Sequence, residues 1–168
     1  MVNKWAWQAV GLSVVLLVAS LAAPARSFAE AQSPDSCLSG LSPVLVAGKF
    51  SGSVDCTQDR LSSRLIGHLK SGSHRFTIYD YHYELKPICP ECAVHGGQRI
   101  IVLRDGLYIG QYKPDSVSAT IVRGKLVLTP VGDTDLPDKY RQPAIVSFTP
   151  RGPRSTVWVE GQNIDFFR

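Results

Sequence analysis

The feature of this 168-residue chain that most restricts its fold is a series of short alternating segments joined by tight turns. Asp105-Gly106 and Arg123-Gly124 each separate two such segments, and Asp-Gly in particular favours the positive φ angles of a type I′ hairpin turn. A longer loop at 150–154, rich in proline and glycine, joins a third pair. The predicted hairpins pair residues 98–104 with 107–112, 118–122 with 125–129, and 144–149 with 155–160. The chain is therefore expected to form mostly antiparallel strands.

Consecutive hairpins of this kind need a second layer, or closure into a ring, to cover their apolar face. We therefore predict a mainly β protein, either an antiparallel β-sandwich or a small barrel, because both show the same alternation and turn spacing. The single β-rich domain is expected to occupy residues 44–168, after a flexible lead-in at 30–43. Residues 44–54 are expected to hold one of its strands.

One segment has the spacing of a helix rather than of a strand. Four apolar side chains recur at helical intervals within residues 59–70, and they are Leu61, Leu65, Ile66 and Leu69. Ser71-Gly72-Ser73 follows as a stop signal. We predict one short helix over about 59–70, covering an end or an open edge of the sheet.

The first 29 residues have the organisation of a signal peptide. Lys4 gives the start a positive charge, residues 9–23 are uncharged and mostly apolar, and small residues around Ala29 offer cleavage sites. The apolar run is shorter than the roughly 20 residues that span a bilayer core. Cleavage after residue 29 would leave no stable membrane span. We therefore expect a protein exported to the periplasm, or secreted.

The four cysteines all follow this segment, and their even number suits an oxidising compartment in which thiols pair. Three pairings are open. The most economical joins Cys37 to Cys56 and Cys89 to Cys92. The first bond would close a loop worth roughly 3 kcal/mol, whereas the second closes too short a loop to stabilise much.

The segment Cys89-Pro90-Glu91-Cys92, with His95 three residues later, allows three interpretations. It is a structural disulfide that fixes a loop, a redox dithiol, or a metal site in which Cys89, Cys92 and His95 bind copper or zinc. The first interpretation needs no cofactor, and we favour it. The other two stay open as the alternative function.

Residues 75–85 alternate between two faces of a predicted strand. One face carries Tyr79, Tyr81 and Tyr83. These rings either belong to the core, with their hydroxyls reaching its rim, or form an aromatic surface that stacks on a sugar ring or on a partner protein. The other face carries Asp80, His82 and Glu84, residue types that serve acid–base chemistry, bind a metal or simply form a solvated surface.

The charge of the chain argues against nucleic acid as a partner. Removal of residues 1–29 takes away Lys4 and Arg26 and no acidic residue, so the net charge falls from +4 to +2. This is too small for a polybasic footprint. No nucleophile elbow, zinc-protease pair, phosphate loop or dinucleotide fingerprint is present, so an independent enzyme is not expected.

The combination of small size, an export signal and a CxxC pair is similar to that of small periplasmic accessory proteins that serve exported dehydrogenases, such as those of methylamine utilisation. This resemblance implies an accessory or maturation factor whose partner is another exported protein. The alternative is a thiol–disulfide redox or copper- or zinc-binding protein that uses Cys89, Cys92 and His95.

Overall fold

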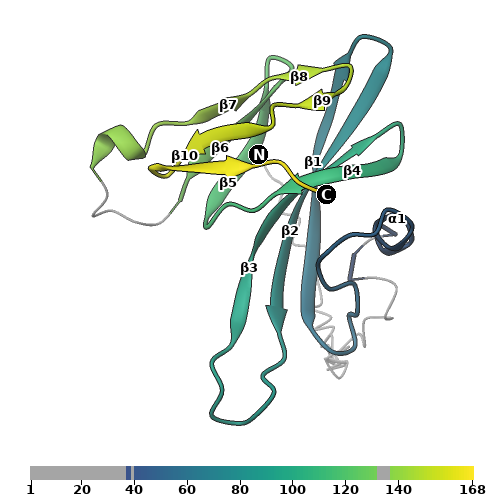
Figure 1. Ribbon diagram of the computed structural model, residues 1–168, viewed down its shortest axis with the longest axis vertical. Coiled ribbons are helices and arrows are strands. Elements are labelled where there is room, and N and C mark those ends of the chain that lie inside the picture. The colour runs from purple at the N-terminus through teal and green to yellow at the C-terminus, as the bar shows by residue number, and fades with distance from the viewer. Residues whose placement is uncertain (1–36, 39, 132–136) are drawn as a thin grey trace, which may run out of the picture. The chain divides into compact units, whose positions relative to one another are not determined.

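The computed structural model describes residues 37–38, 40–131 and 137–168, which all belong to one unit, Ala31–Arg168. The predicted signal peptide lies outside the described residues. The elements, in chain order (Figure 1), are α1 (Ser42–Ala47), β1 (Arg60–Ser71), β2 (His74–Leu85), β3 (His95–Arg104), β4 (Leu107–Tyr112), β5 (Val117–Val122), β6 (Lys125–Pro130), the 3-10 helix η1 (Asp138–Tyr140), β7 (Ala144–Val146), β8 (Phe148–Thr149), β9 (Gly152–Pro153), β10 (Thr156–Val159) and β11 (Gln162–Asp165).

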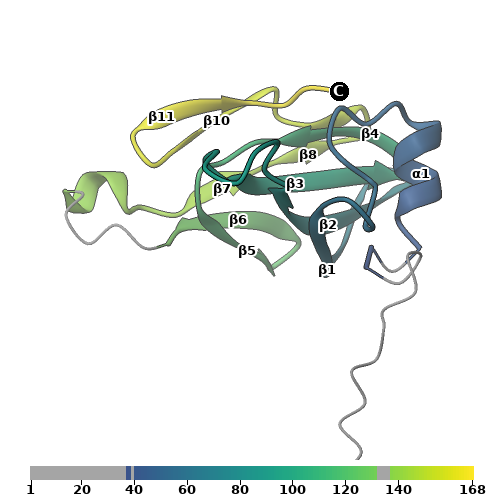
Figure 2. The same ribbon diagram turned by 90° about the horizontal axis from the view of Figure 1, so that it is seen from below.

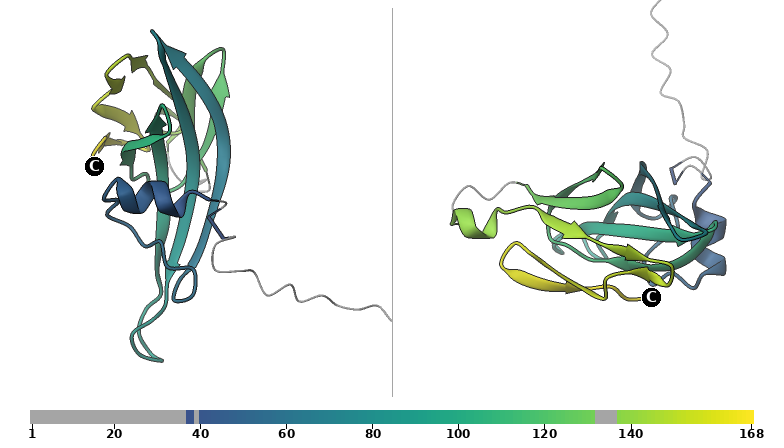
Figure 3. Two further views of the ribbon diagram at one scale, coloured as in Figure 1. Left: turned by 90° about the vertical axis from the view of Figure 1, so that its right-hand side faces the viewer. Right: turned by 90° about the horizontal axis from the view of Figure 1, so that it is seen from above.

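The predicted fold class is confirmed, because the described chain is mainly β and its sheets are antiparallel and built from consecutive hairpins. The largest sheet has the order β1-β2-β3-β4, a second has the order β5-β6-β7, and β8-β9 and β10-β11 form two-stranded sheets. Figures 2 and 3 show β5–β7 on one side of the large sheet and α1 on the other. The described strands close into no barrel.

We call the side of the large sheet that packs on β5–β7 and on β10–β11 its sandwich face. The core there is mostly aliphatic and is drawn from all these strands. Its fully or almost fully buried members include Leu69, Phe76, Ile78, Ile100, Val102, Tyr112, Leu126, Leu128, Val146, Val157, Val159 and Ile164.

We call the opposite side of the sheet the cap face, and the described part of residues 37–56 that covers it the cap. The buried members of this second core are Leu38, Leu41, Leu45, Leu61, Tyr81, Ile101, Leu103 and Tyr108. Leu38 and Leu41 belong to the segment predicted as a flexible lead-in, and both side chains are buried. That part of the chain therefore contributes to the core.

The predicted strand at 44–54 is wrong, since this stretch begins with the helix α1. Pro43 occupies the first turn of α1, a position that favours proline, and Gly48 ends the helix. Leu41 and Leu45 lie four residues apart, so both side chains reach the same side and are buried against the sheet. The apolar residues of this stretch therefore serve a short helix.

The predicted helix at 59–70 is also wrong, because these residues form the edge strand β1. A bulge between Leu65 and Gly67 inserts one residue into the strand, and Gly67 has a φ of 148°. An extra residue reverses which side chains face which side. Leu61 therefore lies in the cap core while Leu69 lies in the sandwich core, although both positions are odd-numbered. A bulged strand thus reproduced the spacing of a helix.

The predicted type I′ turns are confirmed by backbone angles. Asp105 and Gly106 have φ values of 52° and 83°, and Arg123 and Gly124 have 49° and 73°. A pair that was not predicted as a turn, Glu160-Gly161, has 54° and 79° and joins β10 to β11. The predicted pairing of 144–149 with 155–160 is wrong, since β7 pairs with β6, β8 with β9, and β10 with β11.

Candidate functional site

The hairpin of β2 and β3 extends past the other strands, and Figure 1 shows its tip at one end of the drawing. We call residues 83–97 the arm. Strand pairing continues to Leu85 opposite His95, and the loop between them contains the Cys89-Pro90-Glu91-Cys92 segment. Ile88 in this loop is 97% exposed, and Leu85 and Val94 are exposed as well. The tip therefore presents apolar side chains to solvent.

Cys89 and Cys92 form a disulfide at the tip of the arm, with their Cα atoms 5.1 Å apart. The backbone N–H of Cys92 also donates to the carbonyl of Cys89 at 3.1 Å, so the loop turns tightly between them. Both residues are partly exposed. A reactant in solution can therefore reach this bond.

The proposed metal ligands do not form a metal site in this state. The sulfurs of Cys89 and Cys92 bond to each other, and His95 is exposed at the start of β3. Across residues 37–38, 40–131 and 137–168, no three His, Cys, Asp or Glu side chains are placed to hold a metal ion. Thiolate ligation by this segment requires prior reduction of the disulfide.

A polar network lies on the sandwich face where the arm leaves the core. The Asp80 side chain is buried, and Gln98 Nε2 donates to its Oδ1 at 2.7 Å. His82 Nε2 lies 3.0 Å from the same oxygen, and Arg64 Nη2 lies 3.1 Å from Oδ2. The Gln98 side chain is fixed in turn by Val117. Its Nε2 donates to the carbonyl of Val117, and its Oε1 accepts from the backbone N–H of Val117, both at 2.8 Å. The network thus links the two sheets.

A groove of about 420 Å³ lies next to this network. His82, Glu84 and Gln98 line it from the large sheet, and Asp115 and Ser116 line it from the loop before β5. When His82 is neutral and donates its Nε2 proton to Asp80, Nδ1 is left as an acceptor. The predicted pair Asp80 and His82 is therefore brought together, whereas Glu84 pairs with Arg60 at 3.2 Å instead.

The three tyrosines of the predicted aromatic surface are not equally accessible. Tyr81 is fully buried, and its hydroxyl donates to the carbonyl of Ser53 at 2.6 Å, while burial raises its pKa. Tyr79 and Tyr83 are half-buried. Tyr81 therefore offers no ring surface to a sugar or a partner, because the cap covers it.

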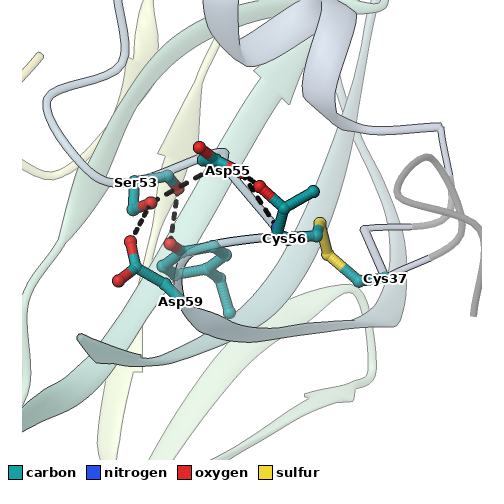
Figure 4. The surroundings of a disulfide bond; sticks show 7 residues. Cys37, Ser53, Asp55, Cys56 and Asp59 are labelled. Atoms are coloured by element: carbon teal, nitrogen blue, oxygen red, sulfur yellow. Dashed lines mark hydrogen bonds between the residues drawn. A yellow bond between two sulfur atoms is a disulfide. The ribbon is translucent and has the colours of Figure 1, made fainter. Parts of the chain in front are cut away.

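The disulfide of Cys37 and Cys56 holds the cap in place (Figure 4). Beside it, the Ser53 hydroxyl donates to Asp59 at 2.5 Å, and Asp55 accepts from the backbone and the hydroxyl of Thr57. These hydrogen bonds from Thr57 lower the pKa of Asp55. The loop after α1 is therefore fixed by polar contacts as well as by the disulfide.

Two further residues that the sequence did not single out lie on the cap face, Phe50 and Arg99. Arg99 alternates with apolar neighbours along β3, which places it with Ile101 on that face. This alternation was the only available signal for its position. Phe50 follows α1, and its ring makes edge contacts with Tyr81 and Tyr108 at 5.4 and 5.7 Å.

Comparison with known proteins places this chain in no family, since no family model, curated protein or solved structure matches it. Among the described residues, no helix has the length and apolar character needed to cross a bilayer.

Proposed function

We propose that this is an exported accessory protein that binds another exported protein through the tip of the arm. The observation that carries this proposal is the near-complete exposure of Ile88 beside the Cys89–Cys92 disulfide. A large apolar side chain that packs on nothing in its own chain is a feature of binding surfaces.

The construction of the arm supports this role. Its two strands are hydrogen-bonded to each other up to Leu85 and His95, and the disulfide closes the loop beyond them. A loop that is ordered before it binds loses less conformational entropy on binding. A cross-link that adds little to folding stability therefore still adds to affinity.

The chemistry of the chain supports the proposed compartment and the proposed class of partner. Two disulfides in a domain of this size favour an oxidising compartment, in agreement with the predicted signal peptide. The partner we propose is an exported enzyme during its assembly, of the periplasmic dehydrogenase type that the size and thiol pattern suggested. In this role the protein needs no cofactor of its own.

A site-specific cross-linking experiment tests the proposal. A photoreactive amino acid replaces Ile88 in the full chain, expressed in its native host, and the matched control carries the same group at Leu107, which is 71% exposed away from the arm. We expect one predominant cross-linked exported protein from position 88 and none from position 107. Equal cross-linking from both positions, or none from position 88, would contradict the proposal.

A second candidate function rests on the exposure of Cys89 and Cys92. A partner thiolate attacks one of the two sulfurs, the Cys89–Cys92 bond breaks, and the other cysteine leaves as a thiolate. A second thiolate of the partner then attacks the partner's sulfur in the mixed disulfide and releases the remaining cysteine as a thiolate, so the partner dithiol is oxidised to a disulfide and Cys89 and Cys92 are both reduced. The reduced pair, with His95, is also the form that could bind copper or zinc.

The reduction potential distinguishes this redox role from binding alone. A Cys89–Cys92 potential near that of periplasmic or disulfide-isomerase catalysts, above about −200 mV, would favour exchange, whereas one below about −300 mV would mark a structural bond. Mass spectrometry of thiol-labelled protein in redox buffers measures it. Copper or zinc bound by the reduced protein and lost in Cys92→Ser would favour the metal-binding form.

A further inference from the structure

The Arg99 guanidinium lies close to two aromatic rings on the cap face. Its Cζ atom is 5.7 Å from the centre of the Phe50 ring and 5.4 Å from that of Tyr83, distances at which a cation and a ring attract. No carboxylate among the described residues forms a salt bridge with it. Among the described residues, this partly buried cation therefore has aromatic rings and no carboxylate as its neighbours.

Two glycines make room for this arrangement. A Cβ atom on Gly52 would lie 2.4 Å from Phe50 Cε1, and a Cβ atom on Gly97 would lie 2.9 Å from the Tyr83 hydroxyl oxygen. Both distances are far below van der Waals contact. The two rings can therefore lie beside the guanidinium only because these positions carry no side chain.

Several buried polar atoms on this face have no hydrogen-bond partner among the described residues. They include Arg99 Nε, the Tyr108 hydroxyl and Gln111 Oε1. The Phe50 ring contacts both Tyr108 and Arg99, and the neighbouring Ser51 accepts a hydrogen bond from Gln111 Nε2 at 2.9 Å. Buried polar groups in folded proteins are nearly always paired, so these unpaired atoms leave the surroundings of Arg99 with unused hydrogen-bonding capacity.

Asp59, whose charge acts on the hydroxyl of the neighbouring Tyr81, is already hydrogen-bonded. One of its oxygens accepts from the Ser53 hydroxyl at 2.5 Å and the other from the backbone N–H of Lys86 at 3.0 Å. Because Arg99 Nε is buried, only the two terminal nitrogens can meet a group arriving from solvent. These two nitrogens form the planar fork that binds a carboxylate with two parallel hydrogen bonds.

We infer that Arg99, flanked by Phe50 and Tyr83, is a binding site for a carboxylate group. The group is supplied by a small organic acid or by an acidic side chain of a partner, and both present the same chemistry to the guanidinium. Phe50 and Tyr83 hold the fork in a fixed orientation, so little side-chain entropy is lost on binding. This site lies on the cap face and does not depend on the role proposed for the arm tip.

An NMR titration of the folded, oxidised protein tests the site directly. Sodium acetate is added at constant ionic strength, and the Arg99 Nε–H signal is followed, with sodium chloride as the reference salt. We expect a saturable shift with half-saturation at roughly 10 mM or below, a weak affinity typical of a single small group. A shift that is linear in acetate, or equal to that in chloride, would overturn the inference.

Titration with N-acetylglutamate amide, an analogue of an acidic side chain, distinguishes the two sources. If N-acetylglutamate amide binds more tightly than acetate, the natural ligand is a protein side chain, and if it binds more weakly, the natural ligand is a small free acid. Either result supports the carboxylate site, whereas binding of neither compound overturns the inference.

Matched variants locate the binding. Arg99→Lys keeps the positive charge but removes the fork, and should weaken acetate binding about tenfold through the loss of one charge-assisted hydrogen bond. Arg123→Gln removes a charge in the exposed turn between β5 and β6 and should leave the titration unchanged. For Arg99→Lys, in which no Arg99 Nε–H remains, the backbone signals of Phe50 and Gly52 report binding. Equal affinity in Arg99→Lys and the wild type would overturn the assignment.

Discussion

The two faces of the large sheet are covered by different kinds of structure. On the sandwich face, further strands pack on the sheet, and the core between them is mostly aliphatic. On the cap face, a six-residue helix and a loop cover several aromatic rings, and the Cys37–Cys56 disulfide holds this cover in place. One face is therefore covered by a second layer of strands, and the other by a short segment that is held by a disulfide.

The buried polar groups of the two faces also differ in how many hydrogen-bond partners they have. On the sandwich face, Asp80 and Gln98 have several partners each. Five buried polar atoms lack a partner among the described residues, and four of them lie on the cap face, on Ser63, Arg99, Tyr108 and Gln111. The sandwich face thus has the satisfied core of a stable scaffold, whereas the cap face retains unused hydrogen-bonding capacity.

The largest expected difference comes from the same substitution made in each core. Leu128 and Leu45 are both fully buried, the first on β6 in the sandwich core and the second on α1 in the cap core. Leu128→Ala should lower the free energy of unfolding by about 4 kcal/mol, because the strands around it cannot close the cavity. Leu45→Ala should lower it by about 2 kcal/mol, because a short surface helix can shift inward.

Urea unfolding followed by far-UV circular dichroism measures both losses, and hydrogen exchange shows where the chain opens. In Leu45→Ala, faster exchange should be confined to the cap. Equal losses in the two variants would mean that the cap is coupled to the sheet as tightly as the second sheet is.

Removal of each disulfide is the next largest effect and again separates the cap from the rest. The double substitution of Cys37 and Cys56 by alanine opens a loop with a sequence separation of 19 and should cost about 3 kcal/mol. The same change at Cys89 and Cys92, only three residues apart, should cost about 1 kcal/mol, because the loop is already closed by a backbone hydrogen bond. Thermal unfolding of both variants gives the comparison.

The wild-type protein with its disulfides intact is the reference for both measurements. A larger loss at the arm than at the cap would show that the arm disulfide is needed for folding, and would weaken the proposal that it serves binding.

Two buried glutamines test the contrast in hydrogen bonding. Gln98→Leu leaves the N–H and the carbonyl of Val117, as well as Asp80, without this partner, and should cost about 2–3 kcal/mol. Gln111→Leu removes one hydrogen bond to Ser51 together with the unpaired Oε1 atom, so its cost should stay below about 1 kcal/mol. Chemical unfolding of the two variants measures the difference, and similar costs would contradict it.

The sequence predicted those parts of the fold that depend on local chemistry. Asp105-Gly106 and Arg123-Gly124 form the expected turns because their positive φ angles are a property of the dipeptide and not of its surroundings. The cysteine pairing that short separations favoured is also found. Alternation along β2 correctly separated Tyr81 from Asp80, which lie on opposite faces.

The errors arose where long-range packing decides the structure. The bulge at Gly67 cannot be seen in a pattern of apolar residues, so an edge strand whose side chains change faces was interpreted as a helix. The alternation along β2 allowed Tyr81 to be either a core residue or part of a binding surface, and the sequence could not show that the cap buries Tyr81 more deeply than Tyr79 and Tyr83. Arg99 was missed for the same reason, since its environment consists of Phe50 and Tyr83, which are distant in sequence.

The smallest expected effect concerns the fifth unpaired atom, which lies outside the cap face. Glu160 is in the turn between β10 and β11, and burial raises the pKa of its carboxyl group above its usual range. The folded state therefore favours the protonated acid, and wild-type stability falls as the pH rises through the folded-state pKa. Glu160→Gln should be slightly more stable than the wild type at pH 7, and this gain should vanish below about pH 4.

Thermal unfolding between pH 3 and pH 8 measures this gain, with Glu91→Gln on the exposed arm as the control for loss of a charge. A gain that is the same at every pH would instead assign the effect to the turn itself and not to burial of the Glu160 carboxylate.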